Sequence, residues 1–263
     1  MKNIAIVTGA SSGTGKLYVE AFDHGMGGPL DEIWIVARRE DKLEEIKKSC
    51  KNNIRVFALD LCKSESFDVI EQALADDPEI VNVQWLVNNA GFGKFGDFTQ
   101  ISSSDNADMV SLNCLAVVEM CYRCLMYMHA GSRIINMSSV ASFLPQAYLS
   151  VYASTKRFVL DFSRSLDFEL KDVGIRTVAV CPKFMHTEFL DQAGDIDVIK
   201  GMTSIGFEDP TKVVRKAIKC AVVGKTTCIP SNDMKLVYAA CKILPYKLAM
   251  KTEQVLCDYT LNH

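Results

Sequence analysis

The order of apolar and amphipathic stretches along the chain limits its possible folds more strongly than any other feature. Short apolar runs occur at residues 3–8, 32–37, 54–60, 83–91, 132–139 and 175–182. Helical patterns lie between and after them, at 14–25, 38–50, 64–77, 103–129 and 151–173. Continuously apolar strands that alternate with helices build a parallel sheet covered on both faces. The pattern therefore predicts an α/β fold with a doubly wound, Rossmann-type parallel sheet.

The whole chain, residues 1–263, is expected to form a single domain, because no linker, repeat or low-complexity stretch divides it. A further helix is expected at 209–224, and residues 226–230 predict a short strand. The sheet should then hold about seven strands, with helices on both faces. A C-terminal helical segment is predicted at about 231–255, kinked or broken at Pro245.

Composition excludes several classes of function. The formal net charge of −3 gives no general attraction to nucleic acid. No run approaches the roughly 18 apolar residues of a membrane-spanning helix. The apolar run near the N-terminus is too short for a signal peptide, so we expect a cytoplasmic protein. Peripheral membrane contact through the apolar C-terminal segment stays open, as does packing of that segment at a subunit interface.

The ten cysteines and four histidines show no metal-ligand spacing. Cys121 and Cys124 form a C-x-x-C pair, but it lies inside a helical pattern and has no second pair at zinc spacing. We expect buried free thiols and no metal.

The first strand-to-helix turn reads TGASSGTG, residues 8–15. Glycines at this place allow a positive φ and a close approach of the backbone to a phosphate, which the N-terminus of the next helix also attracts. The spacing differs from the usual G-x-G-x-x-G, so a tight turn without a ligand is the alternative. The candidate cofactor-binding residues of this turn are Gly9, Ser11, Ser12, Gly13, Thr14 and Gly15.

The second strand ends in VARRE, so Arg38 and Arg39 stand where this fold meets the adenosine ribose. An acidic residue there would bind the 2′-hydroxyl of NAD(H), whereas arginine pairs with the 2′-phosphate of NADP(H). The sequence therefore favours NADP(H). The alternative is a solvated surface pair, with Glu40 and Asp41 as local partners.

Together these motifs resemble the short-chain dehydrogenase/reductase family over residues 1–190, with the nearest likeness to its hydroxysteroid and ketoacyl reductase branch. TGASSGTG is similar to the family's TGxxxGxG, residues 88–91 read NNAG, and Tyr152 with Lys156 matches YxxxK. The resemblance implies further cofactor contacts by Asp60, Leu61, Asn89, Ala90, Gly91, Tyr152, Lys156, Pro182 and Thr187. One position departs from the family: Pro182 precedes Lys183, where a glycine is usual, which puts the local backbone in doubt.

The resemblance also implies a catalytic tetrad of Asn113, Ser139, Tyr152 and Lys156. Tyr152 would transfer the proton, and Ser139 would hold the substrate oxygen. Lys156 would bind the nicotinamide ribose, and Asn113 would support a water that links Lys156 to solvent. Tyr152 and Lys156 are four residues apart and so share a helix face. Since a phenol has a reference pKa of about 10, we expect the nearby ammonium to lower the pKa of Tyr152.

The substrate lid is expected at about 183–208, by analogy with the family. Aromatic and aliphatic side chains dominate the expected pocket, which suits a bulky apolar alcohol or ketone, such as a steroid or an acyl chain. The alternative is that they only pack the lid. The candidate substrate residues are Phe92, Phe95, Val140, Phe143, Tyr148, Phe184, Met185, Phe189 and Met202.

The sequence thus predicts an NADP(H)-dependent oxidoreductase that interconverts a secondary alcohol and a ketone. A non-catalytic NADP(H)-sensing protein on the same fold is the alternative. An epimerase or dehydratase would need a longer substrate domain. The helices at 103–129 and 151–173 resemble those that form dimers and tetramers in the family, so a homodimer or homotetramer is expected.

Overall fold

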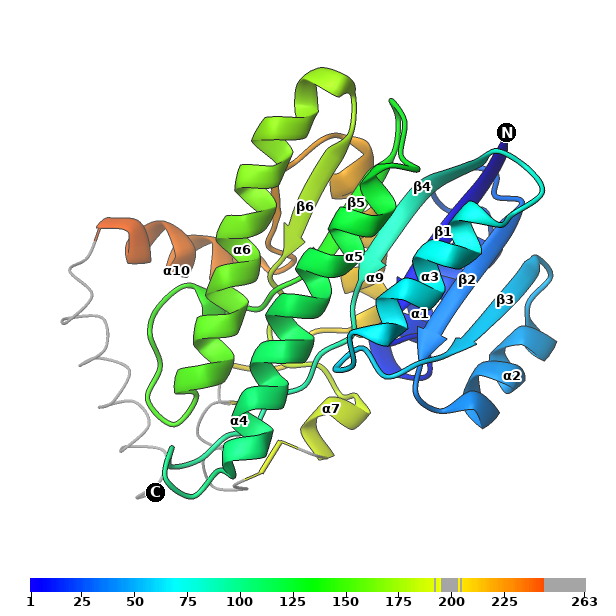
Figure 1. Cartoon of the computed structure of the whole chain (residues 1–263). Helices are drawn as coiled ribbons and strands as arrows, with labels where there is room; N and C mark the ends of the chain where they lie inside the picture. Colours follow the sequence, from blue (N-terminus) through cyan, green and yellow to red (C-terminus); the bar gives the residue numbers. More distant parts are fainter. Residues whose placement is uncertain (192, 195–202, 204, 244–263) are drawn as a thin grey trace.

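A computed structural model describes residues 1–191, 193–194, 203 and 205–243. In this part of the chain seven strands form one sheet in the order β3-β2-β1-β4-β5-β6-β7, and every neighbouring pair is parallel (Figure 1). The strands are β1 Lys2–Thr8, β2 Glu32–Ala37, β3 Asn53–Ala58, β4 Val81–Asn88, β5 Arg133–Met137, β6 Arg176–Val180 and β7 Thr227–Cys228. The predicted doubly wound sheet is confirmed, and its order reverses between β1 and β4, where such folds form a crevice for ligands.

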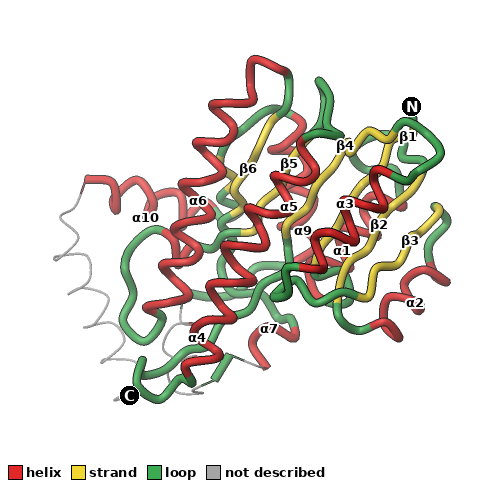
Figure 2. Tube along the Cα trace, viewed as in Figure 1, coloured by secondary structure: helices red, strands yellow, loops and turns green. Residues whose placement is uncertain are grey.

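Helices cover both faces of the sheet (Figure 2). The helices of the described residues are α1 Gly13–Asp23, α2 Glu40–Ser49, α3 Glu65–Ala75, α4 Ser103–Val110, α5 Ala116–Leu125, α6 Ser150–Leu170, α7 Glu188–Asp191, α9 Pro210–Val222 and α10 Asn232–Ile243. Short 3-10 turns occupy Val140–Ser142 and Lys171–Val173.

Two apolar layers hold these helices to the sheet. Side chains alternate along a strand, so Ala5 and Val7 of β1 join the core beneath α1, α2 and α9. Ile4 and Ile6 point the other way, into the core beneath α3, α5 and α6. Both layers exclude water, so polar side chains that could bind a ligand are expected at the ends of the strands.

The region predicted as one helix at 103–129 has an interruption. A π-helical segment, Ser111–Leu115, joins α4 to α5, and α5 ends at Leu125. No proline or glycine in this region signals the change, and π-helical turns often lie at functional sites.

The predicted helix at 151–173 corresponds to α6 and the 3-10 turn after it, and Gly174 ends the segment at φ 81°. The expected strand at 226–230 is confined to two residues. Of the C-terminal segment predicted at 231–255, residues 232–243 form α10. The expected kink at Pro245 lies outside the described residues.

Candidate active site

The glycine turn at the end of β1 is built for close packing. Gly9 and Gly13 have φ angles of 63° and 53°, which disfavour other residues. A Cβ on Gly9 would lie 2.8 Å from the Cα of Ala90. A Cβ on Gly15 would overlap the carbonyl oxygen of Gly9. The glycines therefore bring the turn against the end of β4, in the crevice between β1 and β4.

Asn89 holds this turn in place. Its Nδ2 donates to the carbonyl oxygens of Thr8 and Gly9 at 3.1 and 3.3 Å, and its Oδ1 accepts from the Thr14 hydroxyl at 2.6 Å. The Thr8 hydroxyl accepts from the backbone N–H of Ala90 at 3.0 Å. The predicted motif at residues 88–91 thus supports the turn through its own side chain and backbone.

The two candidate arginines are not equivalent. The Arg39 guanidinium donates to the hydroxyls of Ser11 and Ser12 at 2.9 and 2.8 Å, next to the glycine turn, whereas Arg38 is exposed. Lys42, in the first turn of α2, adds a second cation, and both cations contact Glu188. Sequence reasoning missed Lys42, although a basic residue three positions after Arg39 on a helix was a usable signal.

Asp60 and Leu61 follow β3. The Asp60 carboxylate accepts from the backbone N–H of Cys62 at 3.1 Å, and Leu61 is buried in the core beneath α3. Their predicted contact with adenine stays a prediction.

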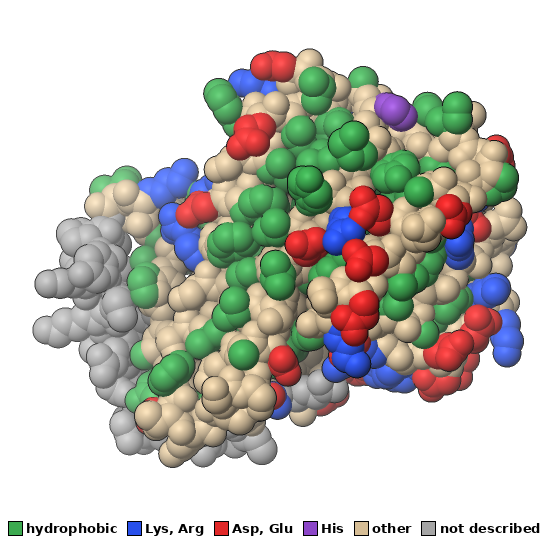
Figure 3. All heavy atoms as spheres, in the orientation of Figure 1, with side chains coloured by type: hydrophobic (Ala, Val, Ile, Leu, Met, Phe, Trp, Pro, Cys, Tyr) green, Lys and Arg blue, Asp and Glu red, His purple; other side chains and the backbone are tan. Residues whose placement is uncertain are grey.

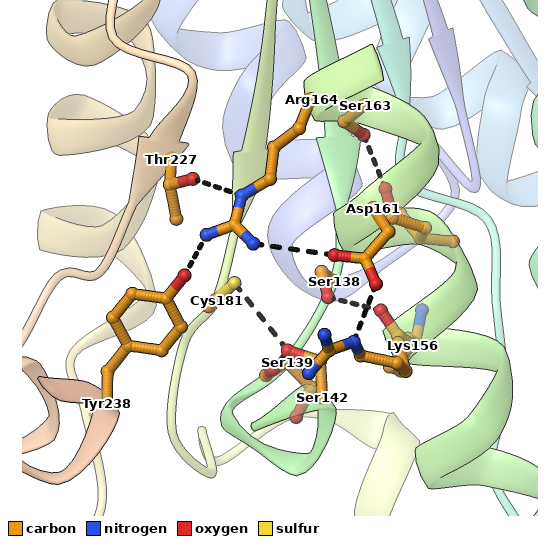
Figure 4. Close-up of polar contacts among 12 residues, drawn as sticks. Ser138, Ser139, Ser142, Lys156, Asp161, Ser163, Arg164, Cys181, Thr227 and Tyr238 are labelled. Atoms are coloured by element: carbon orange, nitrogen blue, oxygen red, sulfur yellow. Dashed lines mark hydrogen bonds and ion pairs between the residues drawn. The ribbon is translucent and has the colours of Figure 1, made fainter. Parts of the chain in front are cut away.

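The other candidate residues meet where β4 and β5 end. Lys156 is buried in α6, and its Nζ donates to the carbonyl oxygen of Met137 at 2.9 Å. Ser138 donates from its hydroxyl to the carbonyl oxygen of Lys156 at 2.7 Å, which fastens α6 to the end of β5 (Figure 4). The Ser142 hydroxyl donates to the carbonyl oxygen of Ser139 at 2.6 Å and fixes the turn that carries Ser139.

The π-helical segment places Asn113 in this cluster. Asn113 is fully buried. Its Oδ1 accepts from the backbone N–H of Phe92 at 3.1 Å. Its Nδ2 donates to the carbonyl oxygen of Phe92 at 2.9 Å and to the Thr155 hydroxyl at 3.1 Å. A Cβ on Gly91 would lie 2.8 Å from Asn113 Oδ1 and 3.3 Å from Lys156 Nζ. Asn113 and Lys156 therefore border the same small space beside Gly91.

Burial changes the acid–base properties of the site. It raises the pKa of Tyr152 to about 12, against the opposing effect of a hydrogen bond with Ser139. Burial also lowers the pKa of Lys156 to about 8. The expected lowering of the Tyr152 pKa by Lys156 is not seen, because the ammonium bonds Met137 and lies 5.7 Å from the centre of the tyrosine ring. Tyr152 is therefore a neutral phenol at neutral pH.

A cavity of about 440 Å³ opens beside these groups. Its walls combine the polar cluster with apolar side chains of the lid. The lining residues include Thr14, Asn89, Gly91, Ser139, Val140, Leu149, Tyr152, Lys156, Pro182, Phe184, Met185, Thr187, Phe189, Leu190 and Ile205. One continuous space thus runs from the glycine turn past Tyr152 to the lid.

Several predicted substrate residues lie elsewhere. Phe95 is buried behind the site, with its ring 5.5 Å from that of Tyr152. Phe143 packs against Tyr238 of α10, at a ring distance of 4.7 Å. Tyr148 is about half exposed and has a φ of 61°, and neither it nor Phe92 is among the residues that line the cavity. Met202 lies outside the described residues.

Lys183, which stands where the family usually has glycine, joins two segments of the chain through its side chain. Among the described residues the non-glycine with positive φ is Tyr148, so Lys183 needs no left-handed backbone. Its Nζ donates to the carbonyl oxygen of Ile205 at 3.0 Å and to the carboxylate of Asp233 at 2.8 Å. Arg164 of α6 also bonds the Tyr238 hydroxyl, so α10 is held on two sides (Figure 4).

The donors at the glycine turn and in the cavity fit a nicotinamide dinucleotide. The turn offers glycines and hydroxyls, and the cations Arg39 and Lys42 lie beside it. Thr187, Lys156 and Asn89 line the same space near Tyr152.

The comparisons with known proteins agree with this arrangement. The family model described as short chain dehydrogenase matches residues 3–196, and the chain belongs to that family of oxidoreductases. It is 33% identical over 195 residues to the human very-long-chain 3-oxoacyl-CoA reductase, an alignment that spans 70% of this chain and 60% of that protein. It is 29% identical over 220 residues to a sulfoacetaldehyde reductase of Chromohalobacter salexigens, covering 80% and 85% of the two chains.

A solved structure shows the same fold. A short-chain dehydrogenase of Sphingobium yanoikuyae in complex with NADPH superposes with a TM-score of 0.76 at 25% identity, covering 91% of this chain and 92% of that one.

Proposed function

We propose that this protein is an NADP(H)-dependent oxidoreductase that interconverts a secondary alcohol and a ketone on a bulky apolar substrate. The observation that carries the proposal is the convergence of Ser139, Tyr152 and Lys156 on the cavity, with Asn113 buried next to Lys156 beside Gly91. The non-catalytic alternative has no matching support in the comparisons, whose named relatives are reductases.

Each residue has a definite part in the reaction. A bound nicotinamide dinucleotide supplies or accepts the hydride. In reduction the Tyr152 hydroxyl donates its proton to the carbonyl oxygen of the substrate, and in oxidation the phenolate takes the proton from the alcohol. Ser139 donates a hydrogen bond to the same substrate oxygen and holds it near Tyr152. The Lys156 ammonium would donate to the nicotinamide ribose, and Asn113, held by Phe92 and Thr155, borders the same space beside Gly91.

Arg39 and Lys42 support the choice of cofactor. Both cations stand beside the glycine turn, and β2 ends without an acidic residue. A 2′-phosphate can pair with both. The NADPH complex of the structurally similar Sphingobium yanoikuyae enzyme agrees with this proposal.

The substrate class follows from the lid side of the cavity. Leu149, Phe184, Met185, Phe189 and Leu190 form an apolar wall opposite the polar cluster. Such a wall favours an extended hydrophobic body beside the carbonyl group. Because this chain spans 60% of the length of the human reductase, an acyl substrate of that kind belongs to the proposal only.

The proposed assembly is a homodimer or homotetramer that forms through the face of α4, α5 and α6. Figure 3 shows hydrophobic side chains gathered on this face, and its exposed members include Val110, Leu115, Tyr122, Met126 and Phe158. Large exposed apolar patches mark interfaces, and light scattering of the purified protein tests the assembly.

A cytoplasmic location is also part of the proposal. Eight cysteines of the described residues are free thiols, which suits a reducing compartment; they are Cys50, Cys62, Cys114, Cys121, Cys124, Cys181, Cys220 and Cys228. None of the helices described has both the length and the apolar character needed to cross a membrane.

Two measurements test the proposed function. Fluorescence titration should give a lower Kd for NADPH than for NADH, and equal or tighter NADH binding would refute the role of the cations. The change Tyr152→Phe should abolish turnover of a ketone panel at the NADPH absorbance band while cofactor binding persists. Retained turnover would place the proton donor elsewhere.

A further inference from the structure

The start of α7 lies across the glycine turn. A Cβ on Gly13 would lie 3.4 Å from the methyl group of Thr187, so the two segments are close. The next residue, Glu188, reaches the cations at the ribose position. Its carboxylate lies 2.7 Å from Arg39 Nη1 and 2.8 Å from Lys42 Nζ. The lid is thereby joined to the start of α2, 146 residues away along the chain.

Arg39 and Lys42 form an anion-binding site, and the Glu188 carboxylate occupies it. The Arg39 guanidinium donates to Ser11 and Ser12 on one side and to Glu188 on the other. Glu188 bridges both cations with its two oxygens, as a phosphate would. Hydrogen bonds from Lys42 and Arg39 lower the pKa of Glu188 to about 2, so the carboxylate is charged at any working pH.

We propose that Glu188 is a specificity-determining residue, an internal anion that competes with the 2′-phosphate of NADP(H) for Arg39 and Lys42. This inference rests on the proposed use of a nicotinamide cofactor. A ligand with the 2′-phosphate must displace the carboxylate, since two anions repel each other on the same cations. A ligand without that phosphate leaves Glu188 in place. Glu188 therefore reduces the preference for NADP(H) over NAD(H) that Arg39 and Lys42 create.

The change Glu188→Gln tests this role, because it removes the charge and keeps the shape. The side chain is partly exposed, so the change is not expected to affect folding. The probes are 2′,5′-ADP and 5′-AMP, which differ in the 2′-phosphate, together with NADPH and NADH. Asp191→Asn is the matched control, because Asp191 is an exposed carboxylate at the other end of α7.

We expect Glu188→Gln to tighten 2′,5′-ADP and NADPH binding about fivefold, as for removal of one partly exposed like charge. The Kd values for 5′-AMP and NADH should stay the same or rise, and Asp191→Asn should change none of the four. The fivefold gain should shrink at about 1 M salt, where exposed charges are screened.

Equal tightening of all four ligands would overturn the inference, because it would mean that the lid merely opens. An unchanged or weaker affinity for 2′,5′-ADP would overturn it as well. The test is the ratio between variant and wild type, so it remains decisive even if the wild type prefers NADH, an outcome that would refute only the proposed cofactor.

Discussion

The substitution Gly91→Ala tests the catalytic cluster most directly, because it adds one methyl group between two of its members. The new Cβ would lie 2.8 Å from Asn113 Oδ1 and 3.3 Å from Lys156 Nζ, where an ordinary contact is at least 3.4 Å. Asn113 is held by three hydrogen bonds and cannot retreat without breaking some of them. One of the two groups must therefore move by about half an ångström.

Overpacking of this kind costs about 1–3 kcal/mol of stability. A displacement approaching 1 Å in a catalytic cluster costs up to about 100-fold in rate, so we expect kcat to fall about 30-fold or more. Steady-state reduction of an accepted ketone gives the rate, and urea unfolding gives the stability.

Gly131→Ala is the control for Gly91→Ala. Gly131 has a φ of 101° and open space around its Cβ position, so alanine there strains the backbone without touching the site. It should lose about 1–3 kcal/mol of stability and keep its kcat at a temperature where the protein is folded. If Gly91→Ala keeps the wild-type kcat, the space between Asn113 and Lys156 has no role in catalysis.

Two further predictions concern pH and stability. The pKa of Lys156 is lowered to about 8, and the amine is charged below that value. The rate of ketone reduction should therefore be flat between pH 6 and 7 and fall as the pH rises through about 8. A rate that increases across this range would contradict the role of the ammonium. Asp167→Asn should lower the free energy of unfolding by about 2–3 kcal/mol in urea, because the buried carboxylate accepts two bonds from Arg176 and one from the backbone N–H of Thr177. Asp161→Asn in the same helix should cost less than about 1 kcal/mol, since the ion pair of Asp161 with Arg157 is exposed. Equal losses in the two variants would contradict the assignment of a stabilising role to the buried Asp167 carboxylate.

Much of the fold could be predicted because local patterns and global topology agree. The apolar strands and the helices between them predict a parallel sheet, and the motifs at its strand ends then meet at one edge. The assignment of Ser139 over Ser138 rested on its thirteen-residue distance from Tyr152. In the structure Ser138 is turned to the backbone of Lys156, whereas Ser139 interacts with Tyr152.

Other features depend on contacts between distant segments and leave little trace in the sequence. The π-helical segment around Asn113 has no breaking residue, and the direction of Phe143 depends on the position of α10. The sign of the Tyr152 pKa shift was also not predictable, because it depends on how deeply α6 is buried. Glu188 gave no signal, since 146 residues separate it from Lys42.

The contact between Lys183 and Asp233 has a consequence for how this enzyme could change its substrate. The same lysine carries the lid through Ile205 and holds α10 through Asp233. A substitution in α10 can therefore shift the cavity wall at Lys183 and Ile205 from outside the cavity. Selection for a new substrate could act on α10, whose residues do not themselves line the cavity, and the search for residues that separate related enzymes should include that helix.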